Sequence, residues 1–274
     1  MKKIAVIGLG IIGASLCRAF IKSGYEAAGF DKDEATLAFA LSSGYITEKA
    51  ENLSDYECVF LAVPPLSAIK ILDEAEFQDN AFVADICGVK ESIEKAVYEK
   101  PRNYRYIGLH PMAGKETSGI FSSSATLFQG ANLIVTIARQ TDERTILEAK
   151  EYARALGFGN IVECSAVEHD RKIALTSQLA HIVSNAYVKS VQVKGCDGFT
   201  GGSFQDMTRI AGVDEKIWTP LYMLNRKNIL NEPNCLIENL SVYREALNDE
   251  DAEKLSEALL EGRLIRQKIK RKND

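Results

Sequence analysis

The 274-residue chain has little of what marks extracellular, metal-binding or nucleic-acid-binding proteins. Its six cysteines form neither a Cys-x-x-Cys pair nor a regular spacing, so we expect no disulfide framework and no metal site. The 33 basic residues are outnumbered by 38 acidic ones, and a net charge of -5 has the wrong sign for binding nucleic acid or an anionic membrane. The chain has only three histidines, so each is a candidate for chemistry.

Long hydrophobic runs are also missing. The apolar stretch 4–20 is interrupted by Gly8, Gly10, Gly13 and Arg18, and no small-residue cleavage site accompanies it. We therefore expect neither a membrane span nor a secretory signal, and we expect a cytoplasmic protein. With 46% hydrophobic and 26% charged residues, the composition is typical of a globular protein that buries its own core.

Short β-branched runs alternate with helical patterns in the first part of the chain. The expected strands are 2–7, 26–30, 58–63, 81–86, 106–109, 133–137 and 161–164, and the expected helices are 11–22, 32–42, 90–99 and 142–155. Strands without polar alternation are buried on both faces. The pattern predicts an α/β fold, a Rossmann-type doubly wound parallel sheet covered by helices.

Only helical patterns follow residue 164. The expected helices are 167–192, 215–230, 234–246 and 249–270, separated by the glycine-rich segment 195–202, by Pro233 and by a break at Asn248. Their apolar residues are numerous for a unit of about 110 residues. We therefore predict an all-helical C-terminal domain, 165–274, that forms a homodimer.

A glycine-rich run follows the first expected strand directly and opens the first helix: Gly8, Leu9, Gly10, Ile11, Ile12 and Gly13. Gly8 turns the chain, Gly10 lets the backbone approach a pyrophosphate, and Gly13 lets the helix pack closely on the strand. Backbone amides at the helix start bind phosphate groups with help from the helix dipole. The run predicts a dinucleotide-binding domain over 1–164; the alternative is glycines that serve only a tight turn.

Asp31 closes the second expected strand, where a carboxylate accepts hydrogen bonds from the ribose hydroxyls and repels a 2′-phosphate. The predicted cofactor is therefore NAD rather than NADP. Val63 and Pro64, after the third strand, either form a wall along the nucleotide or merely end the strand. Gly88, after the fourth strand, completes the predicted cofactor site.

Three further segments carry polar residues in a distinctive order. The first, 110–119, reads His-Pro-Met-Ala-Gly-Lys-Glu-Thr-Ser-Gly and leaves a strand at the carboxyl edge of the sheet. The others are 168–171, Glu-His-Asp-Arg, and 204–211, Phe-Gln-Asp-Met-Thr-Arg-Ile-Ala, followed by Trp218. Together they resemble the prephenate dehydrogenase family, the NAD enzymes of tyrosine biosynthesis, over essentially the whole chain.

The resemblance implies an oxidative decarboxylation. Prephenate loses a hydride from C4 to NAD and its hydroxyl proton to a base, and CO₂ leaves as the ring aromatises to 4-hydroxyphenylpyruvate. His110 matches the family's catalytic histidine. A neutral imidazole, with an ordinary pKa of about 6.5, can accept a proton near pH 7.

The resemblance also implies a substrate site. Arg209 matches the arginine that binds a substrate carboxylate, the alternative being a surface arginine paired with Asp206. His181 matches a polar position of the substrate pocket, or is a buried histidine satisfied by a neighbour. Lys115 and Glu116, on the loop of the first motif, close over the site or cap that loop.

Two positions depart from the family pattern. Gly88 stands where many relatives have a serine between Asp85 and Lys90, and Gln178 stands where many have a histidine. Both changes remove a polar group from the expected pocket. The contact to the substrate hydroxyl then passes to water, to a backbone amide or to Gln178, which we include in the predicted substrate site.

Two other functions stay open at this stage. An arogenate dehydrogenase would replace the substrate's keto group by an ammonium, which Glu116 or Asp206 could bind, and a non-catalytic NAD-binding regulator could keep the fold alone. Because the first strand starts at Lys2 and the last helix runs to about Lys270, we expect neither a fused chorismate mutase nor an ACT domain. Any tyrosine inhibition is then expected at the active site.

Overall fold

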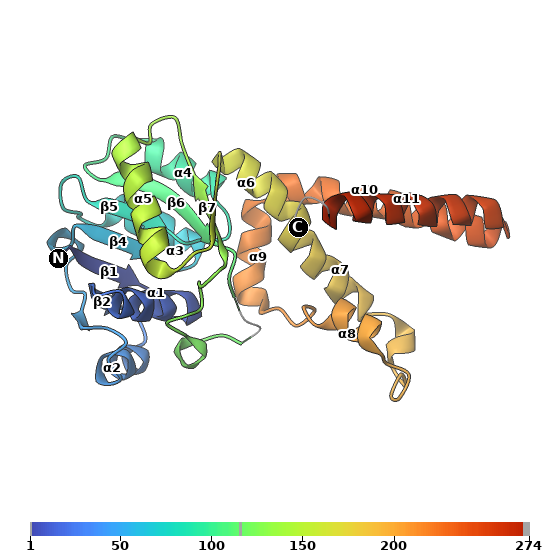
Figure 1. The fold of residues 1–274 in the computed structure, drawn as a ribbon, viewed down its shortest axis with the longest axis horizontal. Coiled ribbons are helices and arrows are strands. Elements are labelled where there is room, and N and C mark those ends of the chain that lie inside the picture. Colours follow the sequence, from blue (N-terminus) through green and yellow to red (C-terminus); the bar gives the residue numbers. More distant parts are fainter. Residues whose placement is uncertain (1, 115–116, 271–274) are drawn as a thin grey trace. The chain divides into compact units, whose positions relative to one another are not determined.

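The structure is a computed structural model that describes residues 2–114 and 117–270. It divides into two compact units, Met1–Asn225 and Arg226–Asp274. The first unit contains a sheet with helices on both faces and a group of further helices, and the second is a pair of helices (Figure 1).

The sheet in the described part of the chain has eight strands in the order β3-β2-β1-β4-β5-β6-β7-β8. They are β1 (Lys3–Ile7), β2 (Glu26–Phe30), β3 (Glu48–Lys49), β4 (Cys58–Leu61), β5 (Phe82–Asp85), β6 (Arg105–Pro111), β7 (Asn132–Thr136) and β8 (Asn160–Cys164). Strands β3 to β6 pair in parallel, which confirms the predicted Rossmann-type architecture. The strand order reverses between β1 and β4, the place where open α/β sheets bind their ligands.

The last two strands differ from the predicted all-parallel arrangement. β7 pairs antiparallel with β6, with Leu109 opposite Val135, and β8 runs parallel to β7. The connection between β6 and β7 is consistent with this direction. Among its described residues the regular element is a short 3₁₀ helix, η2 (Ile120–Ser122), whereas a parallel return requires a crossover of a dozen or more residues, usually a helix.

The helices of the sheet region are α1 (Ile11–Lys22), α2 (Glu34–Ser42), the short η1 (Leu53–Asp55), α3 (Pro65–Glu74), α4 (Glu91–Tyr98) and α5 (Glu143–Leu156). Helix α3 was not predicted, because Pro64 and Pro65 were interpreted as a strand end or a wall. Pro65 is in fact the first residue of α3, where the N–H that proline lacks has no partner in any helix.

Beyond β8, one continuous helical stretch consists of α6 (Ala166–Ile173), the π-helix η3 (Ala174–Leu179) and α7 (Ala180–Tyr187). It ends five residues before the predicted end at 192. The short η4 (Val191–Val193), α8 (Gly202–Thr208) and α9 (Glu215–Leu224) follow. The glycine-rich segment 195–202 predicted only a break, and α8 was missed because it begins inside that segment.

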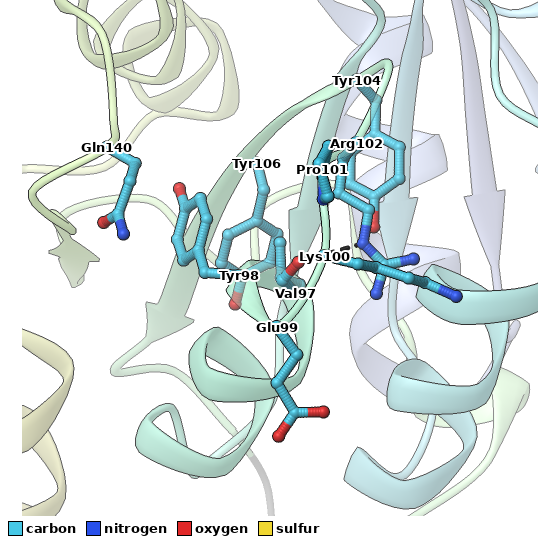
Figure 2. A pocket seen from close by; sticks show the side chains of 9 residues that line it. All are labelled: Val97, Tyr98, Glu99, Lys100, Pro101, Arg102, Tyr104, Tyr106 and Gln140. Atoms are coloured by element: carbon cyan, nitrogen blue, oxygen red, sulfur yellow. Dashed lines mark hydrogen bonds between the residues drawn. The ribbon is translucent and has the colours of Figure 1, made fainter.

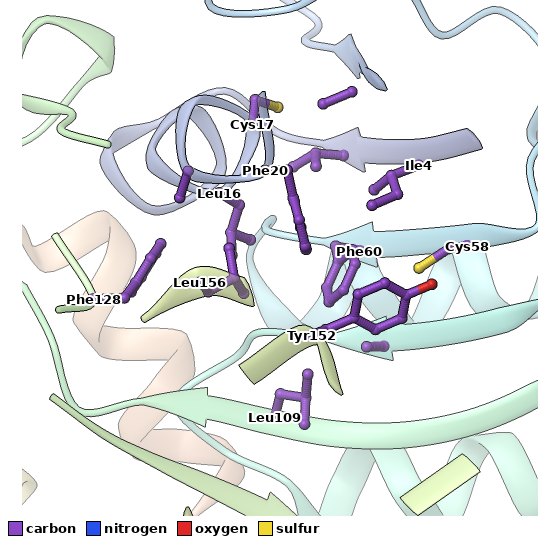
Figure 3. Close-up of a cluster of buried hydrophobic side chains, with 14 of the residues drawn as sticks. Ile4, Leu16, Cys17, Phe20, Cys58, Phe60, Leu109, Phe128, Tyr152 and Leu156 are labelled. Atoms are coloured by element: carbon purple, nitrogen blue, oxygen red, sulfur yellow. The ribbon is translucent and has the colours of Figure 1, made fainter. Parts of the chain in front are cut away.

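Successive residues of each central strand point to opposite faces of the sheet and enter two separate cores. Ile4 and Val6 pack with α1 and α5, whereas Ala5 and Ile7 pack with α3 and α4. In the first core the rings of Phe20 (α1), Phe60 (β4) and Tyr152 (α5) lie 5.2–5.7 Å apart, centroid to centroid (Figure 3).

The second unit is the hairpin of α10 (Arg226–Asn248) and α11 (Ala252–Lys270). Helix α10 runs through Pro233, where a break was predicted; a proline removes one hydrogen bond, and the residues around it continue the helix. Large apolar side chains remain exposed on both helices, among them Ile237, Leu240, Leu259, Leu264 and Ile265. Within the described chain, no helix is both long enough and apolar enough to span a membrane.

A buried charge network fastens β6 and α5 to the start of the sheet. Glu148 on α5 accepts hydrogen bonds from Arg105 Nη2 at 2.7 Å and from Lys2 Nζ at 2.6 Å. Burial raises the pKa of Glu148, but the hydrogen bonds from Lys2 and Arg105 outweigh it, and the net pKa lies below the ordinary value. The carboxylate is therefore stabilised in its charged form.

Arg105→Ala should lower the free energy of unfolding by about 2–3 kcal/mol near pH 7, because Glu148 then stays buried with one partner fewer. A group whose folded pKa is depressed contributes stability above its unfolded pKa and loses it as the pH falls through the folded value. The difference in the free energy of unfolding between variant and wild type should therefore shrink below about pH 4. Urea unfolding at both pH values measures it, with Arg144→Ala, at an exposed site of α5, as the control.

Candidate functional site

The glycine run closes the crevice between β1 and β4. Gly8 has φ +92° and lies against the backbone of Ala62, and Gly13 lies against the carbonyl of Gly8, so a Cβ at either glycine would collide with backbone. Gly10 is different, because no described atom lies within 4 Å of the place where its Cβ would be. The start of α1 is therefore open at the residue where a pyrophosphate would approach the backbone.

The other predicted cofactor residues gather around this loop. The Asp31 carboxylate accepts hydrogen bonds from the N–H of Leu9 at 2.7 Å and from that of Asp33 at 2.9 Å, which sets it at the edge of the glycine run. Val63 Cγ1 lies 2.8 Å from the position of a Cβ on Gly8, and Pro64 caps α3. The residues present fit a dinucleotide: open amides at a helix start, and a carboxylate at the end of β2.

His110 stands on β6 at the carboxyl edge of the parallel strands and contacts a second histidine. Its Nδ1 lies 2.8 Å from Nε2 of His169, and Nδ1 of His169 lies 2.7 Å from Oδ1 of Asp170. His169 and Asp170, on α6, are only 1% and 2% exposed. Two imidazoles and a carboxylate thus form a continuous hydrogen-bonded chain.

This chain determines which nitrogen of His110 can accept a proton. A carboxylate only accepts, so His169 donates from Nδ1 and its Nε2 carries the lone pair. That lone pair accepts the Nδ1–H of His110. The tautomers assigned from this network leave Nε2 of His110 as the free acceptor.

The acceptor nitrogen faces Gly88. A Cβ on Gly88 would lie 3.8 Å from both Nε2 and Cε1 of His110, and 3.8 Å from Cδ2 of Leu221 on α9. Gly88 therefore lies beside His110, and its place in the cofactor site stays a prediction. A serine at this position would bring its hydroxyl within reach of Nε2, so the glycine leaves that nitrogen open.

A buried ion pair lies behind the histidine. Lys90 Nζ is 2.5 Å from Asp85 Oδ1, both side chains are fully buried, and the Tyr106 hydroxyl donates to Asp85 Oδ2 at 2.7 Å. Burial, together with the nearby His169 and Lys90, lowers the pKa of His110 well below 6.5. His110 is therefore a neutral imidazole at physiological pH, which corrects the expectation of an ordinary histidine pKa.

The helical part of the first unit holds the predicted substrate residues. The His181 ring on α7 contacts Trp218 of α9, with the ring centroids 4.1 Å apart and the planes tilted by 48°. Its Nδ1 donates to the Ile210 carbonyl at 2.9 Å. Arg209 caps the end of α8. The two interpretations of His181, a substrate contact and a buried histidine satisfied by a neighbour, both stay open. The hydrogen bond to the carbonyl uses Nδ1 and leaves Nε2 for a ligand.

Gln178 lies in the π-helix and is 2% exposed. Its Oε1 accepts a hydrogen bond from Asn225 Nδ2 at 2.6 Å, and the same nitrogen donates to the backbone carbonyl of Asp170 at 2.8 Å. The amide oxygen of Gln178 is thus used to hold α9 to α6, and a contact to substrate stays a prediction. Lys115 and Glu116 lie outside the residues that the structure describes.

A separate surface pocket of about 340 Å³ opens at the end of α4 (Figure 2). Its lining includes Tyr98, Tyr106 and Arg102, and Arg102 is occupied in capping helix ends, donating to the carbonyls of Val97 and Leu72 at 3.0 Å. None of the predicted site residues that the structure describes lines this pocket. The candidate site is therefore the group around His110.

Comparison with known proteins decides the family. Residues 16–162 match the family model described as "Prephenate dehydrogenase, nucleotide-binding domain", and residues 165–261 match "Prephenate dehydrogenase, dimerization domain". The chain belongs to the prephenate dehydrogenase family. The resemblance inferred from the three motifs is confirmed, as is a nucleotide-binding domain in the first part of the chain.

Relatives with assigned names agree with this membership. The chain is 27% identical over 267 residues to the prephenate dehydrogenase of Bacillus subtilis strain 168, covering 92% of this chain and 72% of that protein. It is 29% identical over 291 residues to the cyclohexadienyl dehydrogenase of Zymomonas mobilis, covering 100% and 98%.

Solved structures share the fold over nearly the whole chain. The prephenate dehydrogenase from A. aeolicus, in complex with hydroxyphenyl propionate and NAD⁺, has a TM-score of 0.85 at 25% identity and covers 98% of both chains. A Synechocystis arogenate dehydrogenase has a TM-score of 0.79 at 24% identity, covering 97% of this chain and 99% of that one. The second likeness concerns the fold alone.

Several residues of this prephenate dehydrogenase family site were missed from sequence. His169 and Asp170 were quoted within a motif but received no role, and Lys90 and Asp85 were noted only for the residue between them. The available signal was the scarcity of histidine: one of three stands directly beside an aspartate. Its partner, His110, is 59 residues away, so only the fold reveals the contact.

The pH profile tests the histidine pair. His110 accepts a proton only when neutral, so a lowered pKa should keep kcat/KM high at pH 6.5 and let it fall only as the pH drops further. His169→Asn removes both a neighbouring imidazole that lowers the pKa of His110 and the acceptor that orients the His110 ring. It should cut kcat about tenfold or more and move the acidic limb toward pH 6.5.

Glu168→Gln is the matched control, because Glu168 is adjacent in sequence but pairs with Lys172 at 2.6 Å instead of the histidines. If the acidic limb of the kcat/KM profile stays in place in His169→Asn, His169 does not influence the pKa of His110.

Proposed function

We propose that the protein is an NAD-dependent prephenate dehydrogenase, which converts prephenate to 4-hydroxyphenylpyruvate, CO₂ and NADH in tyrosine biosynthesis. The observation that carries the proposal is the open Nε2 of His110, held by His169 and Asp170 at the carboxyl edge of a nucleotide-binding sheet. The names of the B. subtilis and A. aeolicus relatives support the choice of substrate.

We assign the residues their roles in this reaction as follows. NAD, when bound, accepts the hydride from C4 of the substrate. His110 Nε2 takes the proton of the C4 hydroxyl, and its Nδ1–H stays bonded to His169. The Asp170 carboxylate at the far end of the chain favours the positive charge that His110 acquires, as the aspartate of a Ser-His-Asp triad does.

The substrate's carboxylates are assigned to the helical part of the first unit. A guanidinium binds a carboxylate through two parallel hydrogen bonds and remains charged at every working pH. We therefore assign Arg209 to one of the two carboxylates of prephenate, and the free Nε2 of His181 to a second polar contact.

The assembly and location are part of the same proposal. The exposed apolar residues of α10 and α11 support a homodimer formed by the helical domain, for which we keep the predicted limits 165–274 and 1–164 for the nucleotide domain. We also keep the cytoplasm as its location.

Arogenate is the second candidate substrate, because the Synechocystis neighbour of the same fold is an arogenate dehydrogenase. Following NADH absorbance with purified protein, NAD and each substrate in turn separates the two. Turnover of neither substrate would contradict the proposal and favour a non-catalytic NAD-binding protein.

Two variants should separate chemistry from binding. Arg209 holds a carboxylate that is already present before the reaction, so Arg209→Ala should chiefly raise KM. His110 interacts most strongly as the proton moves, so His110→Asn should lower kcat by roughly 10²- to 10⁴-fold while NAD still binds. Steady-state kinetics and NAD titration measure both effects, and an unchanged kcat in His110→Asn would assign the base elsewhere.

The cofactor preference tests the role of Asp31. A carboxylate at the end of β2 repels the 2′-phosphate of NADP, so kcat/KM should be higher with NAD. Asp31→Ala should narrow the difference in kcat/KM between the two cofactors, because it weakens the binding of NAD and removes the repulsion of the 2′-phosphate of NADP. Asp33→Ala is the control for nearby charge, since Asp33 caps α2 through the N–H of Thr36. Equal use of both cofactors by the wild type would contradict the assignment.

A further inference from the structure

The backbone at Arg209 is held by few interactions within its own helix. Helix α8 has seven residues, it follows a segment with Gly195 and Gly198 at positive φ, and Arg209 itself is its exposed C-terminal cap. The last carbonyls of any helix lack partners within the helix. The position of Arg209 therefore depends on groups outside α8.

One face of α7 supplies these groups. His181, Ser184 and Asn185 are spaced i, i+3 and i+4, so they project from the same side of the helix. Three side-chain hydrogen bonds run from this face to the backbone of 207–211. Ser184 Oγ donates to the Met207 carbonyl at 2.7 Å, His181 Nδ1 to that of Ile210 at 2.9 Å, and Asn185 Nδ2 to that of Ala211 at 3.1 Å.

We propose that Ser184 and Asn185, together with His181, are positioning residues that fix the backbone on both sides of Arg209 for substrate binding. The proposal rests on the proposed function, in which Arg209 binds a substrate carboxylate. The three bonds bracket Arg209 in sequence, two residues before it and one and two residues after it. They act on main-chain carbonyls, so they set where the arginine side chain begins.

Burial makes the serine bond the most consequential of the three. Ser184 is 2% exposed, and removing its hydroxyl would leave the Met207 carbonyl without this partner. The loss should loosen the end of α8 without touching His110, which lies on the sheet. Weaker preorganisation of a binding group raises KM, whereas the proton-transfer step at His110 is unaffected.

Ser184→Ala and Asn185→Ala should each raise KM for prephenate about tenfold, with kcat and KM for NAD within about twofold of wild type. Thr176→Val is the matched control: it also removes a hydroxyl bonded to a backbone carbonyl, but that carbonyl is Lys172 O within the same helical stretch. Ser184→Thr, which keeps the hydroxyl, should recover most of the affinity for substrate.

A double-mutant cycle with Arg209→Ala identifies the route of the effect. If Ser184 acts through Arg209, adding Ser184→Ala to Arg209→Ala should raise KM no further. An equal rise in both backgrounds would overturn the proposal, as would unchanged KM in both Ser184→Ala and Asn185→Ala. If Ser184→Ala does not fold, the half-buried Asn185 carries the same cycle.

Amide hydrogen exchange separates this proposal from the proposed function. Exchange over 205–211 should become faster in Ser184→Ala and stay unchanged in Thr176→Val. A wild type that turns over neither substrate would refute the proposed function, and the exchange result would still decide whether α7 holds this segment. Unchanged exchange in both serine and asparagine variants would refute the positioning role.

Discussion

The site depends on one buried carboxylate, that of Asp170. Its Oδ1 accepts hydrogen bonds from His169 and from the N–H of Lys90, and its Oδ2 accepts one from the N–H of Glu91. The two amides begin α4, so the charge also satisfies a helix N-terminus, where a negative charge is favourable. One side chain thereby ties the helical stretch after β8 to the sheet and orients the histidine chain that ends at His110.

This arrangement makes the orientation and the protonation of His110, the proposed base, a consequence of packing. His169 can present a lone pair to His110 only because the proton of His169 stays on Nδ1, where it is donated in a hydrogen bond to Asp170. Asp170 is in turn held by backbone amides that cannot turn away. The positive charge of Lys90, which is paired with Asp85, lowers the pKa of His110 and helps to keep the imidazole neutral. The base is thus tuned by groups that the substrate need not touch.

The parts of the fold that could be predicted are those with local causes. The glycine run, Asp31 and the buried strands carry their signals within a few residues, and the crevice between β1 and β4 follows from them. The direction of β7 could not be predicted, because it depends on whether the 112–131 connection contains a crossover helix. The described residues of this connection contain none. Helix α8 was missed because its start is rich in glycine, and it is held by side chains of another helix.

The site divides in the same way. His110 and Arg209 could be assigned by resemblance, but the contact between His110 and His169 joins residues on different elements, and no periodicity indicates it. Gln178 was expected as a substrate contact, and its amide oxygen accepts a hydrogen bond from Asn225. A polar residue in a family position can therefore be structural, and the sequence alone does not distinguish these uses.

The π-helix between α6 and α7 has a consequence for how such a site can change. A π-turn holds one more residue than an α-turn, and one residue corresponds to about 100° of rotation about the helix axis. The extra residue within Ala174–Leu179 therefore sets the angular offset between His169, which faces β6, and His181, which faces α8. Deleting a single residue there would leave both histidines in the chain and still turn one of them away from its partner. The number of residues in this segment is therefore constrained, even at positions where the residue type can vary.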